Sequence, residues 1–241
     1  MGIRFLLSIL VLLTVPAVAV RAELLNIIIV SDNAESEGGY TEFLQEIYRG
    51  NVDVHIDADR YDEDLSDKKK TELETADLVI VSRDLSSKDY NADSEFWSGL
   101  GVPILNHNIK LARSDDHKYW DWLAGSDIST SALTHLTVAY ADDEIFAGVD
   151  TSSGFVEIFT AGKKIDHSDH ASAGSGTVIA TCNGNVVIAR WLGNETLYYD
   201  ESHYAPGAGR VFFALPKDTY EFFDEATGQA KLMLENAILS L

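Results

Sequence analysis

The chain has 241 residues, of which 39 are acidic and 18 are basic, and its formal net charge is −21. Such an acidic surface repels nucleic acid and anionic lipid, so neither is expected as a partner. A single cysteine cannot form an intrachain disulfide, so the fold has to depend on a hydrophobic core, for which the length is sufficient.

The first 22 residues have the order of a secretory signal peptide. Arg4 precedes an apolar stretch over residues 5–15, and small residues end at Ala22, after which we expect cleavage; a cut after Ala19 is the alternative. The stretch is short for a membrane span, so we expect one mature domain over residues 23–241 without a span. This predicts a secreted, periplasmic or cell-surface protein. Asn194 begins an N-glycosylation sequon, a short match that carries no weight by itself.

Strands alternate with helices in the first half of the chain. Residues 24–30 and 77–82 are apolar on both faces, which is typical of central strands covered on both sides. The other expected elements are shorter strands at residues 52–56 and 102–106 and helices at residues 40–49, 66–75 and 93–100. Strand, helix and strand in this order imply right-handed crossovers and a parallel sheet.

The second half predicts antiparallel structure. Residues 109–125 are less regular, with a helix expected in their second half, and residues 135–141 alternate as a half-exposed edge strand does. Asn183-Gly184 separates two β-branched runs, which favours a tight hairpin because both residues accept positive φ. The remaining expected elements are strands at residues 154–159 and 210–215 and a closing helix at residues 227–239.

Three stretches resemble the class I glutamine amidotransferase-like superfamily, in particular its trehalose-utilisation-like (ThuA-like) exported members. Residues 143–149, Asp-Glu-Ile-Phe-Ala-Gly-Val, look like the H-P-I-F-x-G-L segment of that family, with Asp-Glu in place of His-Pro. Residues 207–211 are similar to its glycine–arginine lead into a late strand, and residues 228–239 to its C-terminal helix. The resemblance implies an α/β fold, a flavodoxin-like three-layer sandwich whose mostly parallel central sheet carries a C-terminal antiparallel β-hairpin extension.

The chain departs from the catalytic members at the turn after the third strand. Those members place a cysteine on a sharp, glycine-flanked turn, whereas this sequence reads Ser82-Arg83-Asp84 there. Cys182, the single thiol, stands beside the expected hairpin turn, where nothing activates it. Glutaminase chemistry is therefore not expected.

Polar residues follow each of the expected parallel strands. Because the carboxyl ends of parallel strands meet at one edge of a sheet, we expect a site there for a small polar ligand or a glycan. The plain alternative is that strands run into loops and that loops are polar. The expected ligand-binding residues are Asp32, Asn33, Arg83, Asp84, Asn106, His107 and Arg113.

A catalytic use of this edge is an alternative hypothesis. His107 is then the general base, if an adjacent carboxylate such as Asp32 or Asp84 orients it. Ser82 is the candidate nucleophile, although it lacks the G-x-S-x-G context. A purely structural salt bridge from Arg83 to Asp84 or Asp32 is the plain alternative.

No cofactor is expected. FMN is disfavoured because the loop after the first strand holds Asp32, Glu35 and Glu37, which would repel phosphate. The candidate metal ligands are His167, Asp169 and His170, in a Ser/Gly/Ala-rich stretch that favours a solvated loop. A surface Ca²⁺ site on the acidic residues 57–64 stays open, although the segment lacks the glycine and glutamate of an EF-hand.

The leading functional hypothesis is an exported, non-catalytic binding or accessory module whose ligand is a carbohydrate. A sugar-stacking surface could be formed by Trp97, Trp120, Trp122 and Trp191, and packing in the core is the plain alternative for most of them. Trp120 and Trp122 cannot both face inward on one helix, so one of them is expected at the surface or at an edge. The alternatives are a hydrolase or isomerase of a sugar derivative and a structural cell-surface protein. The sequence leaves the oligomeric state open.

Overall fold

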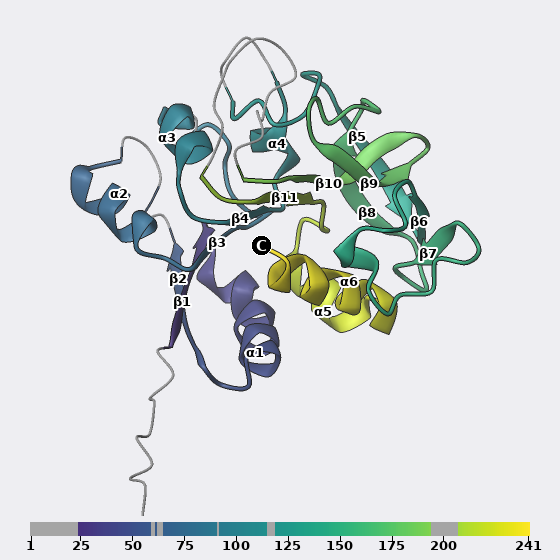
Figure 1. Ribbon diagram of the computed structural model, residues 1–241, viewed down its shortest axis with the longest axis horizontal. Coiled ribbons are helices and arrows are strands. Elements are labelled where there is room, and N and C mark those ends of the chain that lie inside the picture. The colour runs from purple at the N-terminus through teal and green to yellow at the C-terminus, as the bar shows by residue number, and fades with distance from the viewer. Residues whose placement is uncertain (1–23, 59–60, 62–64, 91, 115–118, 194–206) are drawn as a thin grey trace, which may run out of the picture.

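The computed structural model describes residues 24–58, 61, 65–90, 92–114, 119–193 and 207–241 (Figure 1). Residues 1–22, Asn194 and most of the acidic segment 57–64 fall outside these ranges. The expected signal peptide, sequon and Ca²⁺ segment therefore remain predictions. No helix within the described ranges combines the length and apolarity that crossing a bilayer requires.

A nine-stranded sheet with the order β2-β1-β3-β4-β11-β10-β9-β6-β7 forms the centre of the molecule (Figure 1). The first five strands in this order run parallel to one another. These strands are β1 (Leu25–Ser31), β2 (Val52–Ala58), β3 (Leu78–Val81), β4 (Ile104–Asn106) and β11 (Arg210–Phe213). β1 and β3 are apolar on both faces because helices cover the sheet on both sides, as their sequence predicted.

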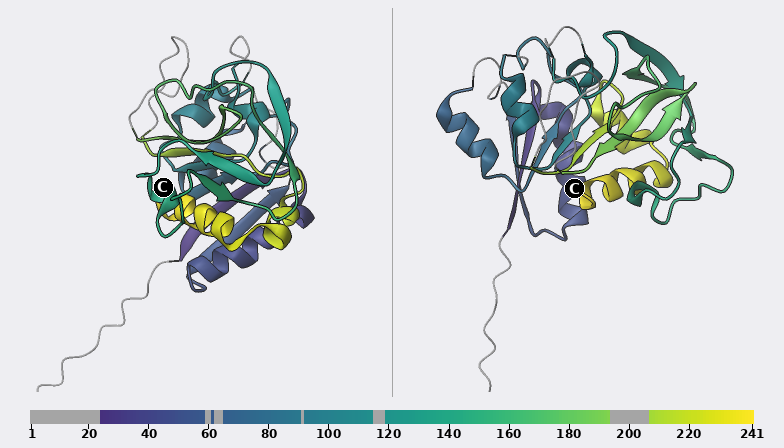
Figure 2. Two further views of the ribbon diagram at one scale, coloured as in Figure 1. Left: turned by 90° about the vertical axis from the view of Figure 1, so that its right-hand side faces the viewer. Right: turned by 45° about the horizontal axis from the view of Figure 1, so that its top comes forward.

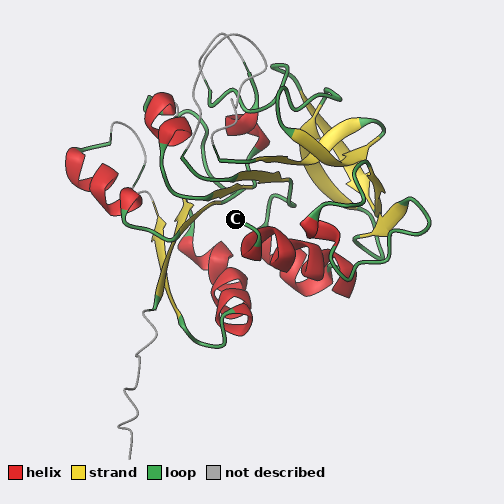
Figure 3. Ribbon diagram, in the orientation of Figure 1, coloured by secondary structure: helices red, strands yellow, loops and turns green. Residues whose placement is uncertain are grey.

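The other half of the sheet is antiparallel (Figure 3). Its strands are β10 (Asn185–Trp191), β9 (Thr177–Cys182), β6 (His135–Val138) and β7 (Phe155–Glu157). The Asn183-Gly184 turn joins β9 to β10 with φ values of 51° and 85°, the positive values that a primed turn requires. This antiparallel half is the expected extension, and it is larger than a hairpin.

Helices lie on both sides of the sheet. One layer contains α1 (Gly38–Ile47), α5 (Thr219–Glu225) and α6 (Gly228–Leu239), and Figure 2 shows these three together from two further directions. The other layer contains α2 (Asp67–Glu74), α3 (Ser94–Gly99) and α4 (Ile109–Ala112). The fold is thus the flavodoxin-like α/β sandwich. Two short 3₁₀ turns, η1 (Ala34–Glu37) and η2 (Glu144–Phe146), complete the helical segments of the described residues.

Several elements of the structure were not expected from the sequence, among them α4, α5 and a second sheet. A second small sheet pairs β5 (Ile128–Leu133) with β8 (Lys163–Ser168) in antiparallel register. Half of the side chains of β5 are polar and it lacks a β-branched run, so its pattern is that of a loop. α5 begins shortly after Pro216 and has only seven residues, which are too few to show a clear helical periodicity.

Two assignments in the middle of the chain are wrong. The described part of the expected helix, residues 119–125, is not helical, because the backbone N–H groups of Trp120 and Leu123 donate to the carbonyls of Leu111 and Ala112, at 2.9 and 2.7 Å. These bonds tie the segment to α4 instead of continuing a helical ladder. β6 is not an edge strand, because β7 pairs with its outer side.

The tryptophans are all interior. Trp97, Trp120, Trp122 and Trp191 are almost wholly buried, and successive ring centroids lie 5.2, 5.6 and 5.7 Å apart. Since the segment is not helical, and Asp121 between them has a φ of 52°, Trp120 and Trp122 can both face the core. The expected surface or edge position for one of them is wrong, and the alternative, packing in the core, holds for all four tryptophans. The row of rings connects α3 in the parallel half to β10 in the antiparallel half.

Replacing Gly184 by alanine tests the hairpin turn. At φ +85° a Cβ is strained although no atom lies within 4 Å of it, so we expect a loss of about 1 kcal/mol in the free energy of unfolding. Urea unfolding of the domain measures this loss. Gly228→Ala is the matched control, because this glycine begins α6 at negative φ in open space and should cost nothing. Equal effects of the two changes would contradict the assigned turn.

Candidate functional site

The carboxyl ends of the parallel strands meet at one edge of the sheet (Figure 1). In the register, Val30 of β1 stands opposite Val81 of β3, and Val81 opposite Asn106 of β4. Ser31, Ser82 and His107 follow these positions, so their side chains enter the same region from neighbouring strands. This is the edge at which the sequence predicts a ligand site.

The buried carboxylate of Glu37 is the centre of this edge. Its Oε1 accepts hydrogen bonds from the hydroxyls of Ser31 at 3.2 Å, Ser36 at 3.1 Å and Thr219 at 3.4 Å, and also from the hydroxyl of Ser82. Burial raises the pKa of Glu37, and the hydroxyl donors oppose that rise. The sequence placed Glu37 only among the acids that disfavour phosphate. The buried serines at the ends of β1 and β3, Ser31 and Ser82, were the signal that these hydroxyls need a shared acceptor.

His107 is also enclosed. Its Nδ1 lies 2.6 Å from the Phe213 carbonyl, which can only accept, so Nδ1 carries the proton and Nε2 accepts from the Tyr40 hydroxyl. Burial lowers the pKa of His107 to about 4, with the bond to Phe213 opposing it, so the ring is neutral at pH 7. A backbone carbonyl therefore orients the ring, and not the carboxylate of Asp32 or Asp84.

Arg83 lies on the other side of the sheet from Glu37. Its guanidinium pairs with Asp166 of β8, and not with Asp84 or Asp32 as the sequence proposed. Asp166 also accepts from the Thr130 hydroxyl at 2.6 Å. Burial acts to raise the pKa of Asp166, but the Thr130 bond and the charge of Arg83 outweigh it and lower that pKa. The ion pair joins the end of β3 to the small sheet.

Three of the expected ligand residues hold loops in place. Asp32 accepts from the Ser86 backbone N–H at 2.6 Å and from the Tyr90 hydroxyl at 3.0 Å. Asn33 caps η1 by accepting from the Glu35 N–H at 3.1 Å. The third, Asn106, is fully buried, and its Oδ1 accepts from the N–H of residue 108 at 2.8 Å.

Asp84 and Arg113 differ from this group. Asp84 is half-buried, and its carboxylate makes no hydrogen bond or ion pair with the described residues. Arg113 donates to the Ser126 carbonyl at 2.9 Å and to the Tyr119 hydroxyl at 2.6 Å, and its guanidinium lies 4.2 Å from the centre of the Tyr119 ring. Arg113 thus binds its own loop, while Asp84 is the acidic group of the edge that can still accept.

The candidate metal ligands do not form a cluster. His167 lies on β8 and not in a loop, and its ring nitrogens contact the Ser168 carbonyl at 2.7 Å and the Ser131 hydroxyl at 3.0 Å. His170 lies 3.4 Å from Asp169 instead. Within the described ranges no group of three histidine, cysteine, aspartate or glutamate side chains is placed to hold a metal ion.

Comparison with solved structures supports the fold. The chain is similar to a ThuA-like protein from Bacteroides uniformis, with a TM-score of 0.56 and 13% identity over 93% of this chain and 94% of that one. It also matches the glutaminase domain of Trypanosoma brucei CTPS with bound acivicin, at a TM-score of 0.45 and 11% identity over 89% and 94%. No family model and no curated protein matches the sequence. The match to the ThuA-like protein confirms the fold that the sequence resemblance implied, and the fold alone.

Replacing His107 by glutamine should change the pH dependence of stability. With a folded pKa of about 4 against about 6.5 unfolded, the stabilisation by neutral His107 is complete above pH 6.5 and declines as the pH falls toward 4, by about 3 kcal/mol. We expect the free energy of unfolding of His107→Gln to fall less steeply than that of the wild type between these pH values. Urea unfolding at several pH values measures both slopes.

The exposed His135 provides the control for this prediction. His135→Gln should keep the wild-type slope, because this side chain lies at the surface and its replacement leaves the buried groups of the fold unchanged. A His107→Gln variant with the wild-type slope would show that the ring is not held neutral by burial.

Proposed function

We propose that this protein is an exported binding or accessory module of the amidotransferase-like fold, without glutaminase activity, whose ligand is a small carbohydrate. The observation that supports a non-catalytic role is the burial of the side chain directly after β3. Ser82 stands there in place of a cysteine, is 1% exposed, and donates its hydroxyl to Glu37. A nucleophile needs access to substrate and a base to take its proton, and this hydroxyl has no access.

The ligand proposal is supported by two acidic residues at the carboxyl edge of the parallel sheet, Asp84 and Asp32. Asp84 is half-exposed without a partner among the described residues, and Asp32 beside it is already held by two donors. Their backbones are joined by a bond from the Asp32 N–H to the Asp84 carbonyl at 3.3 Å. A carboxylate held in place by a rigid sheet is a good acceptor for sugar hydroxyls, because little ordering remains to be done on binding.

The enzyme alternative is less well supported. A hydrolase or isomerase that uses His107 as its base requires Nε2 to reach a substrate, and Nε2 is bonded to Tyr40 inside the core. Export is supported by the order of residues 1–22, which fits a signal peptide.

The absence of glutaminase activity is tested directly. We expect the purified chain to release no ammonia from L-glutamine above the rate without protein, measured by a coupled glutamate dehydrogenase assay with an active glutaminase as positive control. Release that disappears in Ser82→Ala, with thermal stability retained, would overturn the non-catalytic role.

Carbohydrate binding is tested with a panel of neutral di- to tetrasaccharides by isothermal titration calorimetry. We expect one class of saccharide to bind, and Asp84→Ala to weaken it about tenfold, since a lost hydrogen bond to a charged group costs about 1.5–3 kcal/mol. Asp142→Ala, an exposed acid in the loop after β6, should leave the affinity unchanged. The proposed ligand class or its site is wrong if no saccharide binds, or if both variants behave alike.

A further inference from the structure

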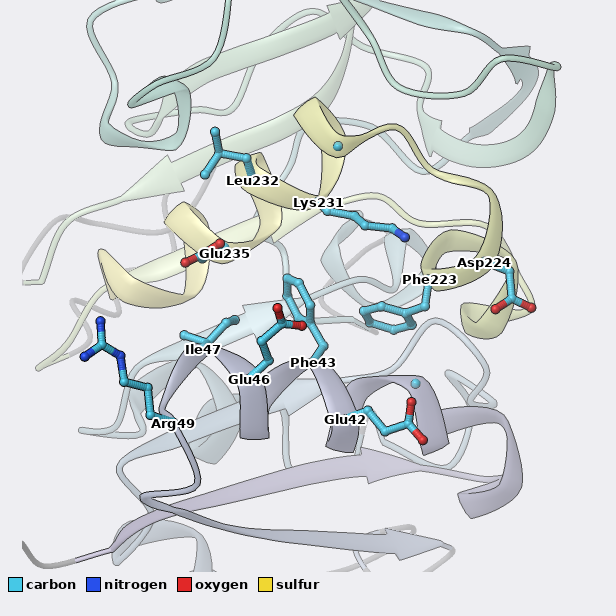
Figure 4. Close-up of a pocket in the computed structure, with 12 residues that line it drawn as sticks. Glu42, Phe43, Glu46, Ile47, Arg49, Phe223, Asp224, Lys231, Leu232 and Glu235 are labelled. Carbon is cyan, nitrogen blue, oxygen red and sulfur yellow. The ribbon is translucent and has the colours of Figure 1, made fainter.

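A groove of about 630 Å³ lies between α1 and α6 and is closed at one end by α5 (Figure 4). Its apolar floor consists of Phe43 and Ile47 from α1 and Phe223 from α5. Leu232 of α6 lies at its border, with its side chain directed away from α1 (Figure 4). Phe43 and Ile47 are four residues apart, so they form one apolar stripe along α1. The sequence predicted α1 and α6 separately and gave no indication that a groove would lie between them.

The floor of the groove is rigid. The Phe223 ring packs edge-on against Tyr40, with centroids 4.9 Å apart, and lies 5.4 Å from the Phe43 ring. Gly39 permits this close approach, since a Cβ on it would lie 2.7 Å from the Phe223 ring. A partner would therefore meet a preformed apolar surface, which lowers the cost of ordering on binding.

Charged side chains line the groove without partners. They lie on both walls, and none makes a hydrogen bond or ion pair with another described residue. Lys231 and Glu235 are four residues apart on α6 yet do not pair; Figure 4 shows Lys231 directed toward Phe223 and Glu235 away from it. The charged side chains are Glu42, Glu46, Arg49, Asp224, Lys231 and Glu235, four acids against two bases.

The charge and shape of the groove fit one kind of occupant. The α1 wall from residue 42 to residue 49 extends roughly 10 Å at 1.5 Å per residue, or two helical turns. A helix that lies in a groove presents apolar residues at i, i+3 or i+4, and i+7, and its flanks meet the groove walls. The excess of carboxylates on the walls calls for lysine or arginine on those flanks. A second copy of this chain, with its own charge of −21, would be repelled.

We propose that the α1–α6 groove docks a basic amphipathic helix of a partner protein. Apolar side chains of this helix lie on Phe43, Ile47 and Phe223, and its basic side chains pair with Glu46 and Glu235 on opposite walls. The inference goes beyond the proposed function, because it concerns another surface and holds whether or not a saccharide binds at Asp84.

The test uses a fluorescein-labelled 14-residue peptide of leucine and lysine that forms an amphipathic helix, at near-physiological salt. A scrambled peptide of the same composition has the same charge but no apolar face. By fluorescence anisotropy we expect the helical peptide to bind at least tenfold more tightly than the scrambled one. The double variant Glu46→Lys/Glu235→Lys should weaken it at least tenfold.

The matched control is the double variant Glu74→Lys/Asp142→Lys, which makes the same change in net charge at exposed acids away from the groove. It should alter the affinity less than twofold, and circular dichroism melting should show both double variants folded. Equal losses in the two double variants, equal binding of the scrambled peptide, or no binding of the helical peptide would overturn the proposal. If a saccharide loses affinity in the groove variant but not in Asp84→Ala, the groove is a sugar site, and docking of a helix is wrong.

Discussion

The shared acceptor at Glu37 is the interaction on which the carboxyl edge of the parallel sheet depends. One carboxylate oxygen accepts hydrogen bonds from hydroxyls at the end of β1, in η1, directly after β3 and at the start of α5. The hydroxyls of Ser82 and Thr219 would otherwise be buried without an acceptor, at a cost of about 1–3 kcal/mol per group. The hydroxyls of Ser31 and Ser36 also donate to the Asn33 carbonyl. The carboxylate in turn needs several donors to remain in the interior, which is why strand ends, a turn and a helix from opposite ends of the chain converge on it.

Two further contacts complete the enclosure of this edge. On the side of Glu37, the Tyr40 hydroxyl and the Phe213 carbonyl hold the His107 ring between α1 and β11. On the other side, the pair of Arg83 with Asp166 anchors the small β5–β8 sheet against the end of β3. The polar groups at the strand ends thus bond mainly to one another. Their arrangement explains why an edge rich in polar residues presents few of them to solvent.

The parallel half of the fold could be predicted from the sequence, and the contacts at its edge could not. Strands apolar on both faces, such as β1 and β3, have one plausible place in a domain, and the Asn183-Gly184 pair has one plausible turn. By contrast, Thr219 is 182 residues from Glu37, and Asp166 is 83 residues from Arg83. No local pattern reports such pairings. Local periodicity also failed at residues 119–125, where backbone bonds to α4 replaced a helix.

The group after β3 differs from the polar groups at the surface in what it can contact. A nucleophile must be accessible, activated and close to a stabilised oxyanion, and the group after β3 is instead buried and committed to Glu37. The same hydrogen bond from Ser82 to Glu37 stabilises the core, since hydrogen bonds to a buried carboxylate are strong where water is excluded. The two proposed recognition surfaces instead use groups outside the interior. They are the Asp84 carboxylate at the carboxyl edge of the sheet and the charged side chains along the α1–α6 groove, and the same sheet supports both.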